Sequence, residues 1–348
     1  MKADTVMPFA RASLPTRRGL LAMGGAIGIG AALTACGGGK ESGSADGGTT
    51  AKSGPWSFKD DRGQTAETKS LPKNIVAFTG TAAALFDYGI QVKGVFGPTR
   101  TKDGKADVQA GDLDIDKVEI IGNTYGEFGV EKYAALQPDV LITDMWQKDV
   151  LWYVPDNSKD KILKLAPSVA LWAADQSMPA ALQRRVDLAK SLGADVNAKK
   201  ITDAKAAFEK ASARLRAAAK ANPGIRVLLG SASPDLFYVS EAKRSCDTRY
   251  FQELGVEFVT PKVDSQGFFE SLSWENVAKY PADLILMDNR TGTLQPSDLG
   301  NKPTWGQLPA VKAGQVLPRL TEPIYSYARV APIVDALAQA IEKAKKVA

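Results

Sequence analysis

The sequence predicts an α/β protein built mostly from parallel sheets. Three observations lead to this prediction: short apolar runs of strand length alternate with helical stretches, polar or Gly/Pro residues follow nearly every run, and one long amphipathic helix lies near the middle of the chain. Because parallel strands are joined through crossover helices, such alternation is typical of sheets covered by helices on both faces. The 348 residues are enough for two domains, each with its own core.

The strand candidates fall into two groups, one in each half of the chain. In the first half they are residues 75–78, 92–96, 119–121 and 140–143. In the second half they are residues 226–229, 237–239, 257–259, 284–287 and 315–317. Most are followed closely by Thr, Ser, Asp, Gly or Pro. Because open α/β sheets bind their ligands at the carboxyl ends of the strands, we expect a binding site there.

One amphipathic helix is predicted between the two groups of strands, over residues 198–221. Its apolar positions recur every three or four residues, as at Ile201, Phe208 and Leu215, and an Asn-Pro-Gly sequence ends it. At about 1.5 Å per residue the helix is ~36 Å long, which is enough to connect two globular lobes. The predicted segments are a signal peptide at 1–35, a tether at 36–54, an N-terminal lobe at 55–176, an interlobe helical segment at 177–222 and a C-terminal lobe at 223–348.

The first 35 residues have the features of an export signal. A basic region with three arginines precedes an uncharged stretch at 19–33 that is too short to span a bilayer. The sequence Leu-Thr-Ala-Cys36 then resembles the lipobox of bacterial lipoproteins, in which the chain is cut before an acylated cysteine. This resemblance implies a protein anchored by lipid at Cys36 to the outer face of the cytoplasmic membrane. Residues 16–21 resemble a twin-arginine motif without its usual Phe and Lys, so Tat and Sec export both stay open.

The composition favours binding over catalysis. The chain has no histidine, which argues against a Ser-His-Asp or Cys-His nucleophile, a zinc hydrolase and an imidazole base. Neither a G-x-x-x-x-G-K-[ST] phosphate loop nor a G-x-S-x-G elbow occurs. The 44 basic and 39 acidic residues become 40 and 38 once residues 1–35, with four basic residues and one acidic residue, are removed. This near-neutral balance gives no reason to expect nucleic acid as a partner. We therefore expect a protein that is not an enzyme and has no cofactor and no resident metal.

The chain has two cysteines, Cys36 and Cys246. If Cys36 carries lipid, Cys246 has no partner for an intrachain disulfide. A free reactive thiol and a buried inert one are both open for Cys246, and the buried thiol is the expectation.

A short pattern occurs once in each half of the chain. Residues 131–142 and 275–286 each run from a Glu through a short helix and a Pro-containing turn, and each enters a strand at an Asp eight residues after the Glu. Such units are common in α/β proteins, and a Glu in the first helical turn favours the helix dipole by roughly a few tenths of a kcal/mol. Taken alone, the pattern allows a purely structural interpretation.

Four segments of the chain, taken together with their order and spacing, resemble those of a known family. They are residues 56–63 (WSFKDDRG), 71–76 (LPKNIV), 130–139 (VEKYAALQPD) and 188–193 (LAKSLG). They resemble landmarks of the iron-siderophore and cobalamin substrate-binding proteins of ABC importers, and the resemblance extends from Trp56 to the C-terminal helix. It implies two Rossmann-like lobes with mostly parallel sheets, joined by one long helix, with the ligand cleft between the lobes. It also implies that Glu131 and Glu275, one on each lobe, dock onto arginines of the membrane permease.

Ligand contacts are expected from aromatic rings and arginines in the loops after the strands. Aromatic rings pack on the apolar arms of a siderophore, and a guanidinium donates hydrogen bonds to the oxygens around ferric iron. The candidates are Arg100, Tyr125, Trp146, Tyr153, Tyr238, Phe269, Arg290 and Tyr325. Trp146 and Arg290 rank first, because each lies just past a strand that the repeated Asp begins. Trp152 is expected on a helix face.

A ferric siderophore is the expected ligand, carried to the permease by a monomer. Bare ferric iron is less favoured, because proteins that bind it directly use Tyr, carboxylate and often His ligands. Hydroxamate, catecholate and citrate chelates stay open, as do haem and cobalamin. The candidates include only two arginines, which slightly disfavours a highly anionic catecholate chelate. The alternative from another class is an extracytoplasmic enzyme that uses paired carboxylates. A surface scaffold without a small ligand is a third interpretation.

Overall fold

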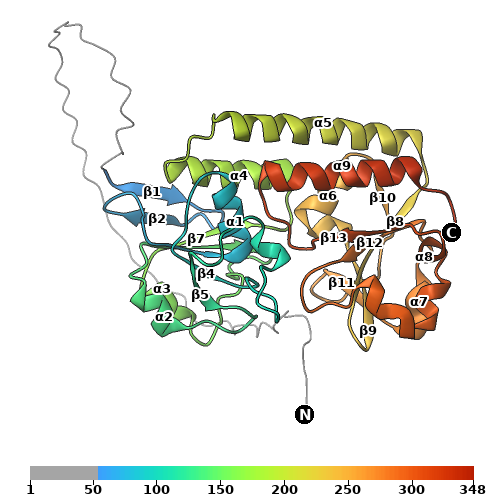
Figure 1. The fold of residues 1–348 in the computed structure, drawn as a ribbon, viewed down its shortest axis with the longest axis horizontal. Coiled ribbons are helices and arrows are strands. Elements are labelled where there is room, and N and C mark those ends of the chain that lie inside the picture. Colours follow the sequence, from blue (N-terminus) through green and yellow to red (C-terminus); the bar gives the residue numbers. More distant parts are fainter. Residues whose placement is uncertain (1–53) are drawn as a thin grey trace, which may run out of the picture. The chain divides into compact units, whose positions relative to one another are not determined.

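A five-stranded parallel sheet, in the order β5-β4-β3-β6-β7, forms the first part of the computed structural model (Figure 1). The structure describes residues 54–348, so the predicted signal peptide, Cys36 and nearly all of the tether lie outside the described residues. The strands are β3 (Ile75–Phe78), β4 (Gly94–Phe96), β5 (Glu119–Gly122), β6 (Val140–Met145) and β7 (Ser168–Trp172). Both β3 and β6 are buried over their whole length, as expected of central strands that helices cover on both faces.

Four helices and a hairpin accompany this sheet. The helices are α1 (Thr79–Asp87), α2 (Val130–Ala135), α3 (Lys159–Leu163) and α4 (Met178–Ser191). The antiparallel hairpin consists of β1 (Trp56–Lys59) and β2 (Thr65–Thr68). It is tied to α4 where the Trp56 indole donates a hydrogen bond to the Ser191 hydroxyl (3.1 Å). We call β1–β7 together with α1–α4 the N-lobe.

A second, mixed sheet has the order β11-β9-β8-β12-β13, with β10 paired to the start of β8. Its strands are β8 (Arg226–Ala232), β9 (Leu236–Ser240), β10 (Glu257–Phe258), β11 (Phe269–Ser273), β12 (Leu284–Asp288) and β13 (Val316–Arg319). β8, β10, β12 and β13 are parallel, whereas β9 and β11 run antiparallel to their neighbours. The helices of this part are α6 (Cys246–Glu253), α7 (Pro303–Gln307) and α8 (Pro309–Lys312). We call β8–β13 together with α6–α8 the C-lobe.

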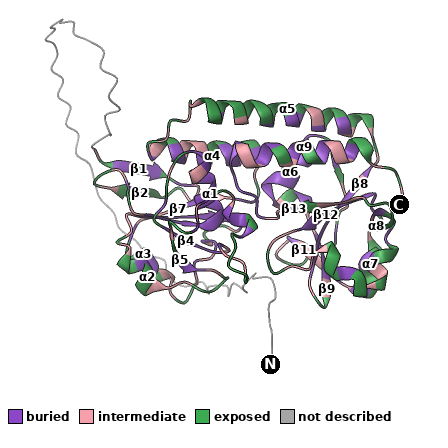
Figure 2. Ribbon diagram, viewed as in Figure 1, coloured by how far each residue is buried: buried purple, intermediate pink, exposed green. Residues whose placement is uncertain are grey.

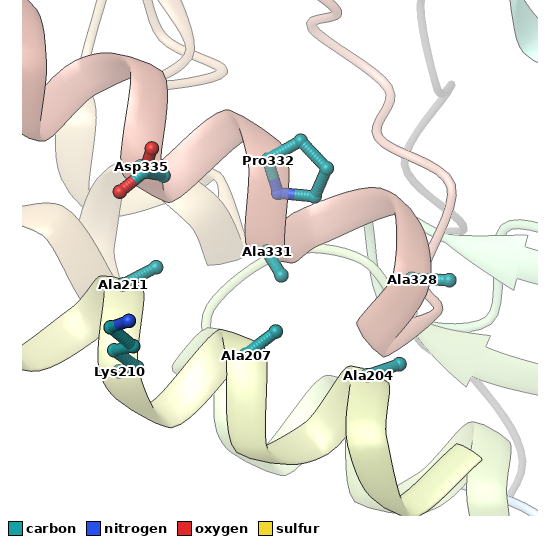
Figure 3. Close-up of a pocket in the computed structure, with 8 residues that line it drawn as sticks. All are labelled: Ala204, Ala207, Lys210, Ala211, Ala328, Ala331, Pro332 and Asp335. Atoms are coloured by element: carbon teal, nitrogen blue, oxygen red, sulfur yellow. The ribbon is translucent and has the colours of Figure 1, made fainter. Parts of the chain in front are cut away.

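The helices α5 (Lys199–Ala221) and α9 (Tyr327–Lys343) lie side by side (Figure 1). Arg214 on α5 donates hydrogen bonds to Asp335 (2.8 Å) and Glu342 (2.7 Å) on α9. Figure 3 shows the groove between the two helices, which is lined mostly by small side chains: Ala204, Ala207, Ala211, Ala328 and Ala331, with Lys210, Pro332 and Asp335. These small side chains let the two backbones approach closely, and Phe208 of α5 also packs against Tyr327 of α9, with ring centroids 5.6 Å apart.

The first turn of α9 is also bound to the N-lobe. The Ser326 hydroxyl, which caps α9, donates to the Asp87 carboxylate at the end of α1 (2.5 Å). Arg329 donates to the same carboxylate (3.1 Å). The two lobes are therefore connected by α5 and also by the contact between the start of α9 and α1. The sequence did not predict this second connection.

The predicted strands are all present, with ends that move by no more than a few residues. The predicted helix over 198–221 is α5, and its buried residues include Ile201, Phe208 and Leu215. Figure 2 shows burial concentrated in the two sheets, whereas α5 keeps an exposed face. The hairpin, β7 and β11 were not predicted. Within residues 54–348, no helix combines the length and the apolar character needed to cross a membrane.

The expectation for Cys246 is confirmed. The thiol is free and buried at the start of α6. Burial raises the pKa of Cys246 to about 12, so the reactive thiolate is scarce at neutral pH.

Candidate ligand-binding site

An aromatic cluster forms around the loop that follows β6. Trp152 lies at its centre, with ring centroids 6.1 Å from Trp146 and 5.6 Å from Tyr153. Tyr125, from the loop after β5, contacts both Trp152 (5.7 Å) and Tyr153 (5.3 Å). Phe78, the last residue of β3, contacts Tyr153 (5.2 Å). These five residues are the aromatic cluster, and they come from β3, β5 and β6 or the loops after them, at the carboxyl end of the same parallel sheet.

The backbone of this loop is fixed by hydrogen bonds and by two unusual conformations. The Trp152 amide donates to the Asp144 carbonyl (3.0 Å), and the Thr143 hydroxyl donates to the Trp152 carbonyl (2.7 Å). Asp149 and Tyr153 have φ values of 62° and 60°, in the left-handed region that non-glycine residues rarely adopt. A loop held in this way presents its side chains in defined positions.

The cluster has a buried base and one exposed ring. Trp146 and Trp152 are each 6% exposed, whereas Tyr125 is 41% exposed. The Trp146 indole N–H is buried and has no hydrogen-bond partner within the described residues. Burial raises the pKa of Tyr125 and of Tyr153, and the negative charge of Glu322 raises that of Tyr153 further. Both phenols are therefore uncharged near neutral pH, and the cluster presents apolar ring faces.

Arg290 stands just after β12, where it is paired with two carboxylates. Its guanidinium donates to Asp288 (2.8 Å) and also to Glu322. The Ser231 hydroxyl, from the neighbouring strand β8, donates to Asp288 as well (3.0 Å). Burial alone would raise the pKa of Asp288, but the charge of Arg290 lowers it. Burial alone would lower the pKa of Arg290, but Asp288 and Glu322 raise it, so this ion pair stays charged.

Glu322 connects the charged residues of the C-lobe to the aromatic cluster of the N-lobe. It lies in the segment after β13 and is 5% exposed. One carboxylate oxygen accepts hydrogen bonds from the Gln109 amide and the Trp152 indole, both at 3.1 Å. The other carboxylate oxygen accepts from Arg290. The candidate site is thus an aromatic surface with a charged group at its edge.

The other sequence candidates have different surroundings. Tyr238 on β9 and Phe269 on β11 form an edge-to-face pair with centroids 5.3 Å apart. Arg100 is partly exposed and pairs with Asp116. Tyr325 is 2% exposed, its hydroxyl donates to the Ala173 carbonyl (3.1 Å), and the Arg185 guanidinium covers its ring.

Four of the sequence candidates come together in this site: Tyr125, Trp146, Tyr153 and Arg290. The expectation that Trp152 lies on a helix face is wrong, because Trp152 occupies a turn and its ring is the centre of the cluster. Glu322 and Gln109 were missed. Glu322 follows β13 by three residues, so the rule that placed ligand contacts after strands would have found it had acidic side chains been considered.

The two residues expected to dock the permease occupy matching positions. Glu131 lies in the first turn of α2, and Glu275 lies in the first turn of a short 3₁₀ helix, Trp274–Lys279. Both are exposed. The carboxylate of Glu275 has a lowered pKa because its own backbone N–H and the Ser273 hydroxyl donate to it. Each Glu is thus available on the surface of its lobe, as a docking residue must be.

The fold and this site define a class of protein. The sequence matches the family described as periplasmic binding protein over residues 75–318, and the chain belongs to this family. It is 63% identical to DesE, a ferric-siderophore receptor protein from Streptomyces coelicolor, in a match that covers 84% of this chain and 100% of that one with a TM-score of 0.82.

A further relative and a further solved structure are less similar to this chain. The Fe(3+)-citrate-binding protein YfmC from Bacillus subtilis is 23% identical over 257 residues, which are 74% of this chain and 76% of YfmC. SirA from Staphylococcus aureus, solved in complex with staphyloferrin B, is 19% identical, and the match covers 83% of this chain and 99% of SirA with a TM-score of 0.58. The likeness to SirA shows the fold alone.

Proposed function

We propose that this protein captures a ferric siderophore outside the cytoplasm and delivers it to the permease of an ABC importer. The observation that carries the proposal is the 63% identity to the ferric-siderophore receptor DesE over the whole of that chain. The Fe(3+)-citrate-binding relative also handles iron in chelated form.

The chemistry of the site supports an organic iron chelate as the ligand. The aromatic cluster offers ring faces to the apolar arms of such a molecule, and the exposed ring of Tyr125 is the first that a ligand would meet. Within residues 54–348, no three His, Cys, Asp or Glu side chains gather in a way that would hold a metal ion. These features favour iron that arrives already chelated over bare ferric iron. They also favour capture over catalysis.

The proposal also includes a membrane anchor and two contacts with the permease. The lipobox-like sequence before Cys36 would hold the protein at the outer face of the cytoplasmic membrane, and the tether would let it reach the permease. Glu131 and Glu275 would then pair with permease arginines, one contact on each lobe. Because the two carboxylates lie on different lobes, two such contacts together would set the orientation of the docked protein.

Intrinsic tryptophan fluorescence tests the proposal directly. The purified protein is titrated with a ferric hydroxamate, a ferric catecholate, ferric citrate, haem and cobalamin. We expect saturable quenching by at least one ferric chelate, because Trp146 and Trp152 belong to the site. Binding of haem or cobalamin in place of every ferric chelate would contradict the proposal, and a Soret band in protein purified from iron-limited cells would identify haem.

A further inference from the structure

We propose that Glu322 is a specificity-determining residue, which neutralises Arg290 and so directs the site towards neutral or cationic ferric chelates and away from anionic ones. This inference rests on the proposed function, because it concerns which iron chelate the same site accepts.

The contacts of Glu322 make it a counter-ion of Arg290. Glu322 accepts from one end of the guanidinium, and Asp288 accepts from the other with a distance of 2.8 Å. The side chain of Arg290 is only 16% exposed, so solvent screens these charges weakly. Two carboxylates therefore share one guanidinium, and the positive charge expected to attract an anionic ligand is already compensated.

A third carboxylate adds to this acidic surrounding. Asp107 is 2% exposed, and one of its oxygens accepts from the backbone N–H of Gln109 (2.9 Å). Its other oxygen is buried without a hydrogen-bond partner within the described residues. Gln109 joins Asp107 to Glu322, because its backbone N–H donates to Asp107 and its side-chain amide donates to Glu322 (3.1 Å). Three carboxyl groups, those of Asp107, Asp288 and Glu322, are thus linked by hydrogen bonds to one another or to Arg290.

This arrangement acts differently on chelates of different charge. An anionic chelate that pairs with Arg290 must displace the Glu322 carboxylate, which would then be buried without its cation, a costly state. A neutral chelate leaves the pair intact and packs on the aromatic cluster. A chelate that carries an ammonium group gains attraction to the unbalanced carboxylates. The expected order of affinity is therefore set by chelate charge, with the anionic chelate weakest.

The test compares the wild-type protein with Glu322→Gln. Glutamine keeps an oxygen that can accept from Gln109 and Trp152 but removes the charge. Dissociation constants are measured by tryptophan quenching for a neutral ferric trihydroxamate, a trihydroxamate with a free ammonium group, and a trianionic ferric tris-catecholate. In Glu322→Gln, the ratio of the dissociation constant of the trianionic chelate to that of the neutral one should fall by about tenfold or more, on the scale of one unit charge at short range.

Using a ratio removes effects that all chelates share. Glu322 also contacts the N-lobe, so its replacement alters the link between the lobes, but such a change affects every chelate in the same direction. The matched control is Asp203→Asn, which removes the same charge from the exposed face of α5, where Asp203 pairs with Lys199 (2.5 Å). The ratio should stay at the wild-type value in Asp203→Asn. The gain should disappear in Glu322→Gln/Arg290→Gln, because the released guanidinium is what the anionic chelate uses.

A measurement on the wild-type protein covers the case in which Glu322→Gln does not fold. In the wild-type protein the trianionic chelate should bind at least about tenfold more weakly than the neutral one, because the buried carboxylates that repel it are screened only weakly. A wild-type protein that binds neutral and trianionic chelates equally, or a ratio in Glu322→Gln equal to that in Asp203→Asn, would overturn the role of Glu322 while the proposed function stands. Failure to bind any ferric chelate would instead remove the proposed function, and this inference with it.

Discussion

Tyr153 illustrates how much a single residue contributes to this site. Its backbone lies in the left-handed region, which costs of the order of 1–3 kcal/mol for a bulky side chain and persists only where surrounding contacts hold it. Those contacts are the rings of Phe78, Tyr125 and Trp152. Since the rings are already positioned by one another, little side-chain freedom is left to lose when a ligand binds.

Trp146 gives the first test at this scale. Replacement of Trp146 by Ala should weaken binding of a ferric siderophore by ~1–2 kcal/mol, because an aromatic anchor is lost from the cluster. Affinity is measured by fluorescence quenching of the remaining tryptophans, with circular dichroism to verify folding. The matched control is Trp56→Ala, a truncation of another buried tryptophan that lies on β1 and bonds Ser191. Unchanged affinity in a folded Trp146→Ala would place Trp146 outside the site.

Sequence reasoning found the aromatic and positive parts of the site but not its negative part. Trp146 and Arg290 follow strands directly, so the general rule for α/β sheets points to them. Glu322 also lies just after a strand, but its importance comes from contacts with Gln109 and Trp152, residues far away in the sequence. Charge compensation of this kind depends on tertiary structure and cannot be predicted from spacing.

At the scale of elements, the repeated Asp of the sequence has the same task in both sheets. Asp139, just before β6, accepts from the backbone N–H groups of Lys73 and Asn74 (2.8 Å each), which precede β3. Asp283, just before β12, accepts from the N–H of Arg226 at the start of β8 (2.9 Å). Each Asp thus fixes the start of the neighbouring parallel strand. The repeat has a structural role in both lobes, beside any role of the two Glu residues.

Asp283 provides a prediction about stability and pH. It also accepts from the N–H groups of Val347 (2.7 Å) and Ala348 (3.0 Å). Burial would raise the pKa of Asp283, but these backbone donors and Arg226 lower it overall. A lowered pKa in the folded state gives stability that is present above the unfolded-state pKa and is lost as pH falls through the folded-state value.

Asp283→Ala should therefore reduce the free energy of unfolding by about 1–3 kcal/mol at pH 7, because three partly buried backbone N–H donors lose their acceptor. The difference from wild type should shrink as the solution is acidified below the ordinary range of Asp pKa values. Urea titrations at a series of pH values measure this, with Asp203→Ala as an exposed control. A difference that stays constant down to strongly acidic pH would show that the carboxylate charge is not the cause.

Most elements with a strong apolar pattern were predictable, although β7 (SVALW) was missed, whereas β11 and the hairpin, which are short and half-polar, were not. The buried strands β3, β6, β8 and β12 are continuous apolar runs, which is the signal of parallel strands covered on both faces. β11 has the sequence FESLS, and the hairpin strands alternate buried and exposed residues over only four positions. Such short, half-polar segments become strands because a neighbouring strand offers its hydrogen bonds.

At the scale of the whole molecule, Glu131 and Glu275 should serve the permease and not the ligand. Glu131→Lys/Glu275→Lys should keep the thermal unfolding temperature and the siderophore affinity of the wild type, because both side chains are exposed. Iron uptake through the intact transporter should fall strongly, since like charges would then face the permease arginines. The single variants Glu131→Ala and Glu275→Ala should each reduce iron uptake less than Glu131→Ala/Glu275→Ala does. Normal uptake by the double Lys variant would show that the docking assignment is wrong.

The membrane anchor is testable by cell fractionation. Cys36→Ala should leave the protein uncut or release it from the membrane fraction, because the cysteine thiol is the expected site of acylation. Cys246→Ala is the control, since that thiol is buried and its loss should leave processing unchanged. A Cys36→Ala protein that is still processed and membrane-bound would exclude the lipoprotein assignment.

The hydrogen bond from the Trp152 indole to Glu322 also has an optical consequence. It joins a natural fluorophore of the N-lobe to a carboxylate in the segment that follows β13. Indole emission depends on hydrogen bonding and on local polarity, so any separation of the two lobes at this point changes the emission of Trp152 directly. The protein therefore contains its own spectroscopic probe of this contact, which reports whether the contact breaks on ligand binding without attaching a dye.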